Sequence, residues 1–357
     1  MATHFYPLKV LKVKKETPDA VSVVLDIPES LADAFSHKEG QNITIRKLIG
    51  GEEIRRSYSI CTAPHENELK VAVKYIDGGA FSAYANNELR PGDVLEVMPP
   101  VGNFRARFAE TDAPKYLAIA AGSGITPVIS IIKHTLQTQP GSEFTLIYGN
   151  RSRGSIIFFE ELEGLKNRFL TRFNFINILS RERTDVELNY GRINAQKLQE
   201  LSKVVDYSQI SHAYVCGPEE MIFAARDFLI AKGVEEKNIH FELFTTPGAK
   251  SVQEKAIVNT ENGPKSLITI KLDGRSIEFS LGYNSHTILD AALSQGADLP
   301  YACKGGVCAT CKAKVMQGEV RMETNYALEE EEVAEGYVLA CQSHPVSEIV
   351  TLDFDIK

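Results

Sequence analysis

The sequence predicts a multidomain α/β and β chain, in which an antiparallel β-barrel precedes a doubly wound parallel α/β domain and a small C-terminal domain. Three observations predict this organisation. Short strands with alternating apolar residues fill the first part, strand and helix patterns alternate in the middle, and four cysteines gather near the C-terminus. At 357 residues the chain is too long for one ordinary core.

The first domain is expected over residues 1–108. Its alternating strands are expected at Leu8–Val13, Val21–Leu25, Leu69–Tyr75 and Val94–Met98. Glycine-containing turns at residues 77–79 and 91–93 separate them. Several short strands at this spacing are typical of an antiparallel barrel.

The second domain is expected over residues 109–245 and begins with a buried strand at Tyr116–Ala121. The turn Gly122-Ser-Gly124-Ile-Thr126-Pro127 follows and leads into an apolar helix. We expect Thr126 to cap this helix and Pro127 to be its first residue. A glycine turn that enters a helix binds a dinucleotide pyrophosphate, because free N–H groups and the helix dipole face the anion.

The alternation of strands and helices continues through the second domain. Strands are expected at Phe144–Tyr148, Phe175–Leu179, Ala213–Cys216 and Ile239–Phe244, and helices near Ile157–Lys166, Ala195–Leu201 and Glu219–Ala231. Repeated β–α units predict a doubly wound parallel sheet, with its ligands at the carboxyl ends of the strands.

The cysteines of the C-terminal part have the spacing C-x4-C-x2-C, followed by a distant fourth cysteine. The predicted metal ligands are Cys303, Cys308, Cys311 and Cys341. This is the ligand pattern of a plant-type [2Fe-2S] cluster, and Gly305 and Gly306 allow the backbone to wind tightly around it. A structural zinc site is the alternative, but such sites usually use two C-x2-C pairs. Residues 266–357 resemble the plant-type ferredoxins, which implies a β-grasp fold.

Two motifs of the barrel resemble the flavin-binding signatures of the ferredoxin–NADP reductase superfamily. They are Arg56-Ser57-Tyr58-Ser59 and Gly79-Ala-Phe-Ser82. Arg56 offers a fork of donors to a pyrophosphate, and Tyr58 offers a flat ring to the isoalloxazine. The resemblance implies that Ser59 lies near flavin N5, that Gly79 and Ser82 meet phosphate, and that Val73 and Lys74 line the ring with backbone groups.

Two motifs of the second domain resemble the nucleotide-binding signatures of the same superfamily. Cys216-Gly217-Pro218 resembles the motif that faces the nicotinamide, although a plain strand-to-helix turn would look the same. Ser180-Arg181 resembles the motif that binds the 2′-phosphate of NADPH, with Arg151, Arg183 and Tyr190 as possible helpers. This resemblance favours NADPH as the coenzyme. Glu182 could instead bind an NAD ribose, so NADH stays open.

The last strand of the second domain ends in Glu242 and Phe244. In related reductases an aromatic or acidic residue here approaches the flavin, whereas the alternative is an ordinary core strand.

Hydride transfer requires no general acid or base from the protein, and Thr126 and Ser59 are the best candidates for polarising the flavin. The candidate catalytic residues are Ser59, Thr126, Cys216 and Glu242.

Together these signatures resemble the reductase components of bacterial multicomponent oxygenases, and most of all the phenylacetyl-CoA epoxidase reductase type. The resemblance implies electron transfer from NADPH through FAD to the [2Fe-2S] cluster and on to an oxygenase or hydroxylase component. FAD is favoured over the FMN of phthalate-dioxygenase-type reductases. The alternatives are a stand-alone flavin reductase or dioxygenase that acts on small acceptors, and a non-catalytic four-cysteine zinc module.

The net charge of −8 is unevenly distributed, since residues 266–357 hold 14 acids against 7 bases. An acidic domain can steer towards a basic protein partner, whereas this charge balance disfavours nucleic acid. We expect no membrane segment. We also expect a cytoplasmic protein, because the cysteines suggest no disulfide framework and this fits a reducing compartment. Residues 246–265 are polar and are expected to form a linker.

Overall fold

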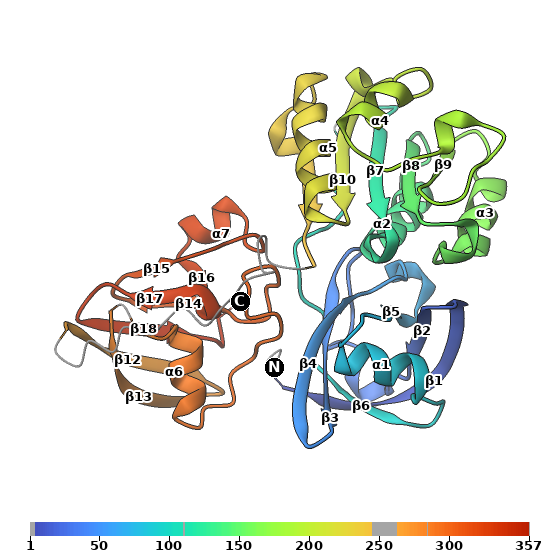
Figure 1. Cartoon of the computed structure of the whole chain (residues 1–357). Helices are drawn as coiled ribbons and strands as arrows, with labels where there is room; N and C mark the ends of the chain where they lie inside the picture. Colours follow the sequence, from blue (N-terminus) through green and yellow to red (C-terminus); the bar gives the residue numbers. More distant parts are fainter. Residues whose placement is uncertain (1–3, 110, 245–262, 284, 357) are drawn as a thin grey trace.

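The computed structural model describes residues 4–109, 111–244, 263–283 and 285–356. Figure 1 shows the N-terminal barrel in blue, the α/β domain from green to yellow above it, and the C-terminal domain from orange to red beside them. The predicted linker lies outside the described residues except for its last three, and the first strand of the C-terminal domain begins at Lys265. No described helix is both long enough and apolar enough to cross a membrane.

The barrel is a six-stranded antiparallel sheet with the order β4-β3-β6-β1-β2-β5. Its strands are β1 (Tyr6–Thr17), β2 (Ala20–Leu25), β3 (Asn42–Ile49), β4 (Glu52–Ser59), β5 (Leu69–Lys74) and β6 (Val94–Val97). A bridge between Ile60 and Val71 joins the two edge strands and closes the sheet. The barrel prediction is therefore confirmed, although β3, β4 and the helix α1 (Ala80–Asn87) were not predicted as elements.

The α/β domain is a five-stranded parallel sheet with the order β11-β10-β7-β8-β9. Its strands are β7 (Lys115–Ala121), β8 (Glu143–Asn150), β9 (Phe173–Leu179), β10 (Ile210–Cys216) and β11 (Ile239–Glu242). Its helices are α2 (Ile125–Thr138), α3 (Phe159–Arg168), α4 (Ala195–Leu201) and α5 (Glu219–Ala231). The strand order reverses between β7 and β10, which is where such sheets bind their ligands.

One detail of the predicted helix start is wrong. Helix α2 begins at Ile125, so that Gly124 and not Thr126 is its N-cap, and Pro127 is its third residue. The glycine turn is itself wound as a 3-10 turn, which starts the helical backbone before the threonine is reached. The Thr126 hydroxyl instead donates to the Ser123 carbonyl at 2.9 Å.

The C-terminal domain is a five-stranded mixed sheet with the order β13-β12-β18-β14-β16, beside a two-stranded ribbon of β15 and β17. Its strands are β12 (Lys265–Leu272), β13 (Arg275–Gly282), β14 (Lys312–Gln317), β15 (Val320–Met322), β16 (Tyr337–Leu339), β17 (Ser343–Pro345) and β18 (Ile349–Asp353). Its helices are α6 (Ile288–Ser294), which Thr287 caps, and α7 (Glu330–Ala334). The helix α6 packs into the core under this sheet, as the β-grasp prediction requires.

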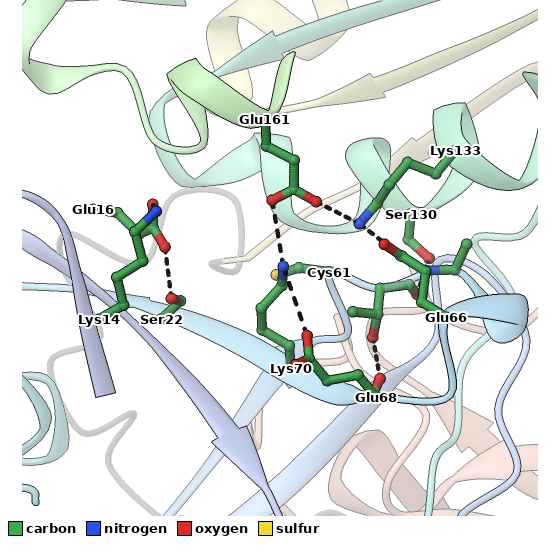
Figure 2. Close-up of polar contacts among 12 residues, drawn as sticks. Lys14, Glu16, Ser22, Cys61, Glu66, Glu68, Lys70, Ser130, Lys133 and Glu161 are labelled. Carbon is green, nitrogen blue, oxygen red and sulfur yellow. Dashed lines mark hydrogen bonds and ion pairs between the residues drawn. The ribbon is translucent and has the colours of Figure 1, made fainter. Parts of the chain in front are cut away.

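A network of charged side chains joins the barrel to the α/β domain. Figure 2 shows Lys133 of α2 between the carboxylates of Glu66 and Glu161, at 2.7 Å from each. Lys70 of β5 approaches Glu161 from the barrel side at 3.3 Å. Burial would raise the pKa of Glu161, but Lys133 and Lys70 outweigh it and hold this pKa below the ordinary value. Helix α2 is thus tied to the barrel through a residue in its middle.

Replacing Lys133 with Met should destabilise the chain by about 2 kcal/mol, because it leaves two half-buried carboxylates without their common partner. The Lys133 side chain is only 5% exposed. The midpoint of denaturant unfolding measures the effect. The matched control is Lys237→Met, which breaks an ion pair with Glu235 whose two side chains are mostly exposed. Equal midpoints for the two variants would contradict the proposed contribution.

Candidate active site

The three domains meet at a cavity of about 510 Å³, within the size range of cofactor pockets. Its wall includes predicted residues from each domain. The predicted residues that line it are Arg56, Ser57, Tyr58, Ser59, Lys74, Gly79, Ser82, Thr126, Glu242, Phe244, Cys303 and Cys308. The fold therefore brings together segments that are up to 252 residues apart in the sequence.

The barrel wall of the cavity presents the first flavin motif. Tyr58 is half-buried and packs against Phe81, with ring centroids 5.4 Å apart and planes tilted by 37°. Burial raises the pKa of Tyr58, which keeps its phenol neutral. Arg56 is exposed, and one of its nitrogens donates to the Arg55 carbonyl at 2.7 Å. The wall thus offers a neutral aromatic ring beside a positive charge, as a flavin with a pyrophosphate requires.

The second flavin motif forms the start of helix α1. Ser82 accepts a hydrogen bond from the Ile76 N–H at 3.1 Å and donates to the Gly79 carbonyl at 3.0 Å. A Cβ at Gly79, the N-cap of the helix, would lie 2.6 Å from the Ser82 hydroxyl oxygen. Glycine is therefore required here, and the helix N-terminus next to the cavity suits a phosphate.

The glycine turn lies where β7 and β10 end side by side. A Cβ at Gly124 would stand 2.1 Å from the Cys216 carbonyl oxygen, and Gly122 has a φ of +55°. This close approach brings Ser123 and Thr126 to the cavity wall. The Cys216 side chain itself is fully buried behind the wall, and burial raises the pKa of its thiol well above the ordinary value.

Several other predicted residues do not line the cavity. They are Val73, Gly122, Gly124, Pro127, Cys216, Gly217 and Pro218, together with Ser180 and Arg181 at the end of β9. Val73, Gly122, Gly124 and Pro127 are sequence neighbours of residues that do line it. The segment 216–218 follows β10, and Ser180 and Arg181 follow β9, and no residue of either segment lines the cavity. Their roles as cofactor ligands stay predictions.

Glu242 is half-buried at the cavity wall, and among the described residues its carboxylate has one weak hydrogen-bond partner. It borders the cavity, and the Ser59 hydroxyl donates to its carboxylate at 3.3 Å. Burial raises the pKa of Glu242 from 4.5 to about 8, while the hydrogen bond from Ser59 opposes this rise. At neutral pH the group is therefore mainly a carboxylic acid, which can donate a proton in a hydrogen bond towards the cavity.

The cysteine loop forms the third side of the cavity. Cys308, Cys311 and Cys341 are buried, whereas Cys303 is exposed. The Cys303 sulfur lies 3.1 Å from the Cys308 sulfur and accepts the Gly305 N–H at 3.3 Å. A backbone donor that points at a sulfur stabilises thiolate ligands, which is the environment that an iron–sulfur cluster needs.

The backbone of this loop is wound as a cradle. Gly306 has a φ of +75°, and a Cβ there would meet the Thr324 carbonyl oxygen at 2.9 Å. Lys304 also has a positive φ of 52°, which is uncommon for a residue with a side chain. Among the described residues no group of three or more His, Cys, Asp or Glu side chains is arranged to hold a metal ion. The fit of the four cysteines to a cluster therefore rests on their chemistry, the loop and the similarity to known proteins.

The nucleotide-specificity motif follows β9. The Ser180 N–H and hydroxyl both donate to the Asn150 carbonyl, at 2.9 and 3.2 Å. Arg181 is exposed, and its N–H donates to the Arg151 carbonyl. The guanidinium of Arg183 lies over the Tyr190 ring, 4.8 Å from its centroid. This edge of the sheet thus carries three exposed or stacked basic residues.

Sequence reasoning missed several residues of the cavity wall. They are Asn42, Ala72, Ile76, Phe81, Ser123, Leu243, Ala302 and Val307. The Asn42 amide oxygen is buried and has no hydrogen-bond partner among the described residues. An orphaned acceptor on the cavity wall fits a bound flavin, which has ring N–H and ribityl hydroxyl donors. Asn42 lies opposite Ser59 on the neighbouring strand, and this pairing is what connects it to a predicted flavin residue.

Comparisons with known proteins agree with the fold and with its three domains. Residues 7–106 match the model of an oxidoreductase FAD-binding domain, residues 118–227 an oxidoreductase NAD-binding domain, and residues 270–346 a 2Fe-2S iron-sulfur cluster binding domain. The chain is 47% identical over 356 residues to a 1,2-phenylacetyl-CoA epoxidase subunit of Escherichia coli (strain K12), with 99% of each chain covered.

Two further comparisons cover nearly the whole chain. The ferredoxin reductase component of 3-ketosteroid-9-alpha-monooxygenase from Rhodococcus rhodochrous is 32% identical over 354 residues, which cover 97% of this chain and 96% of that one. The solved structure of phthalate dioxygenase reductase has a TM-score of 0.56 at 23% identity and covers 98% of both chains, which shows a shared fold.

The fold and the cavity define an oxidoreductase with FAD-binding, NAD-binding and 2Fe-2S domains. The chain belongs to the family of three-domain electron-transfer reductases that includes the 1,2-phenylacetyl-CoA epoxidase subunit of Escherichia coli. The cofactor prediction is confirmed at the level of these domains. The 2Fe-2S model also decides between the alternatives for the four cysteines, in favour of a cluster and against a zinc module.

Replacing Glu242 with Gln should remove a pH dependence of stability. The folded protein keeps a proton on Glu242 up to a pKa of about 8, whereas the unfolded chain loses it near the ordinary value, so stability falls as the pH rises between the two. Relative to pH 5, we expect the variant to gain about 2 kcal/mol over the parent by pH 8, less than the full effect because Glu242 is partly exposed.

The midpoint of denaturant unfolding as a function of pH measures this gain. Glu236→Gln is the matched control, because Glu236 is exposed and lies in the short turn that precedes β11. Curves for the parent and Glu242→Gln that run parallel from pH 5 to pH 8 would contradict the raised pKa.

Proposed function

We propose that this chain takes electrons from NADPH and passes them through FAD and a [2Fe-2S] cluster to an oxygenase component. One observation supports this proposal most strongly. A single cavity is bordered by the flavin motif, the nucleotide-binding turn and two of the four cluster cysteines. Such a cavity can bring the flavin, the nicotinamide and the cluster loop next to one another.

When bound, a flavin accepts an electron pair as a hydride and releases electrons singly, which a one-electron cluster requires. The residues of the chain bind and orient. Ser59 of the barrel and Thr126 of the α/β domain both offer hydroxyl groups to the cavity, and Tyr58 offers its ring. The neutral carboxyl of Glu242 avoids a negative charge beside a pocket that receives electrons. Ala302 and Val307 form an apolar wall that excludes water on the cluster side.

NADPH is the proposed coenzyme because of the geometry at the end of β9. The Glu182 carboxylate accepts the Arg153 N–H at 2.9 Å, so one of its oxygens is already engaged within the chain. Arg181 and Arg183 then present positive charge at the same edge, and guanidinium groups suit a 2′-phosphate. NADH is the alternative coenzyme.

Replacing Arg181 with Ala should raise the KM for NADPH at least about tenfold, because a charged hydrogen bond to the phosphate is lost. The KM for NADH should stay within about twofold. Initial rates of ferricyanide reduction measure both constants. Arg168→Ala is the control, because Arg168 lies at the end of α3 and its guanidinium donates to the Gln137 side chain. Equal changes in the KM for NADPH and for NADH would show that Arg181 does not bind the 2′-phosphate.

The oxygenase partner is inferred from the named relatives. The two curated relatives described above are a subunit of an epoxidase and a reductase component of a monooxygenase, and a glycine betaine monooxygenase reductase subunit is 29% identical. The 47% identity over 99% of the chain favours a phenylacetyl-CoA epoxidase-like partner over a ring-hydroxylating system. The cytoplasm is the proposed compartment, since the thiols of a cluster need a reducing environment.

Reconstitution tests this function. With NADPH and the oxygenase component of a phenylacetyl-CoA epoxidase, the chain should support oxygen-dependent consumption of phenylacetyl-CoA. Cys308→Ser should abolish this consumption while ferricyanide reduction continues, because ferricyanide can take electrons before they reach the cluster. If the cysteine variant supported the oxygenase as well as the parent does, the cluster would not lie on the path of the electrons. If the parent reduced ferricyanide but did not support the oxygenase, the chain would be a stand-alone flavin reductase.

A further inference from the structure

We propose that Arg55 and the hydroxyl group of Thr44 are positioning residues that hold the cluster loop against the flavin pocket. In this arrangement their contacts set the rate at which electrons pass from the flavin site to the cluster. The inference rests on the proposed function for its electron-transfer readout. The contacts themselves cross from the barrel to the C-terminal domain and are independent of that function.

Arg55 joins the two domains through its whole guanidinium group. The side chain is 5% exposed and donates to the Asp298 carboxylate at 2.7 Å and to the Leu299 carbonyl at 3.0 Å. Glu53 accepts its third hydrogen bond at 2.7 Å. The guanidinium also lies over the Tyr301 ring, 4.4 Å from the centroid. One buried barrel residue therefore fixes the segment that leads into the first cluster cysteine.

The position of Arg55 in its strand explains this direction. Neighbouring residues of a strand point to opposite faces, so Arg56 lines the flavin cavity while Arg55 contacts the C-terminal domain. A single strand, β4, thus holds both the flavin wall and the docking contact. If the C-terminal domain moves relative to Arg55, it therefore moves by the same amount relative to the flavin-binding wall of the cavity.

A second contact is a cluster of three hydroxyl groups. Thr44 lies 3.1 Å from Ser57 and 3.1 Å from Thr310, measured between the hydroxyl oxygens. Thr44 and Thr310 are buried. Thr310 stands between Cys308 and Cys311, and Ser57 belongs to the flavin motif. Two hydrogen bonds through Thr44 therefore connect the flavin-binding strand to the cluster loop.

Contacts on the other side of the loop complete the docking surface. Val307, inside the cysteine loop, packs against the hydrophobic core of the α/β domain. Asn103 donates to Glu332 at 2.6 Å, and Arg107 pairs with Glu329 at the start of α7. The acidic N-terminal end of α7 is thus held by the region that joins the barrel to the α/β domain.

The docked position matters because the rate of electron transfer falls steeply as the gap between two centres widens. Cys303 and Cys308 border the cavity only while the C-terminal domain stays against β3 and β4. The Asp298 side chain is 69% exposed, so salt should weaken its attraction to Arg55. Concentrated salt should therefore slow electron transfer to the cluster, provided that Asp298 is present.

The test uses the complete protein with its cofactors and the double variant Thr44→Val/Asp298→Asn. The matched control is Thr269→Val/Glu278→Gln, which also removes one threonine hydroxyl and one carboxylate, from an exposed hydrogen-bonded pair on the neighbouring strands β12 and β13. Stopped-flow absorbance after mixing with NADPH separates reduction of the flavin from reduction of the cluster.

We expect flavin reduction within about twofold of the parent, and cluster reduction about tenfold slower in the double variant, equivalent to about 1.4 kcal/mol. The control variant should match the parent in both phases. Raising the salt from about 0.05 to about 0.5 M should slow the cluster phase in the parent and have less effect in the double variant. An unchanged cluster phase would overturn the inference.

Amide hydrogen exchange supplies a readout that needs no electron transfer. In the oxidised protein, the double variant should exchange faster over residues 42–46 and 298–310 than the control does. If NADPH failed to reduce the cluster even in the parent, the proposed function would fail while this exchange result would still decide the docking. Identical exchange in both variants would overturn the positioning role.

Discussion

The close packing of Gly124 against the Cys216 carbonyl is the constraint on which the site depends. Because no Cβ stands between them, the parallel strands β7 and β10 can end side by side and the turn before α2 can reach the cavity. The same helix is then tied to the barrel, since Ser130 donates to the Thr62 carbonyl at 2.7 Å and Lys133 joins two carboxylates. The nucleotide-binding turn is thereby fixed relative to the flavin wall.

Buried acids in this protein follow two different rules. Glu161 faces two lysines, which hold its pKa below the ordinary value despite burial. Among the described residues Glu242 has one hydrogen-bond partner, the Ser59 hydroxyl, and burial raises its pKa to about 8. The first group acts as a structural anion between domains, whereas the second is a neutral acid on the cavity wall. Residue type alone did not distinguish them, because the difference lies in partners from other segments.

The sequence was sufficient for features that depend on local chemistry. The spacing of Cys303, Cys308 and Cys311 predicted the cluster class, and the β–α alternation predicted the parallel sheet, because both patterns lie within short segments. Strand β4 and helix α1 were missed, since their residues show neither clear alternation nor a strong apolar stripe. Strand β3 was missed although its first residues alternate, because Arg46 and Lys47 interrupt the pattern after Ile45. Asn42 and Arg55 could not be predicted as site or docking residues, because their roles follow from strand pairing and from contact with a distant domain.

The central claim is that one cavity passes electrons from a nicotinamide coenzyme to the four-cysteine cluster. An anaerobic titration with NADPH, followed by visible absorbance and low-temperature EPR, tests it most directly. The account predicts that the flavin and cluster bands both bleach and that the rhombic signal of a reduced [2Fe-2S] cluster develops. Bleaching of the flavin bands without any cluster signal would contradict it.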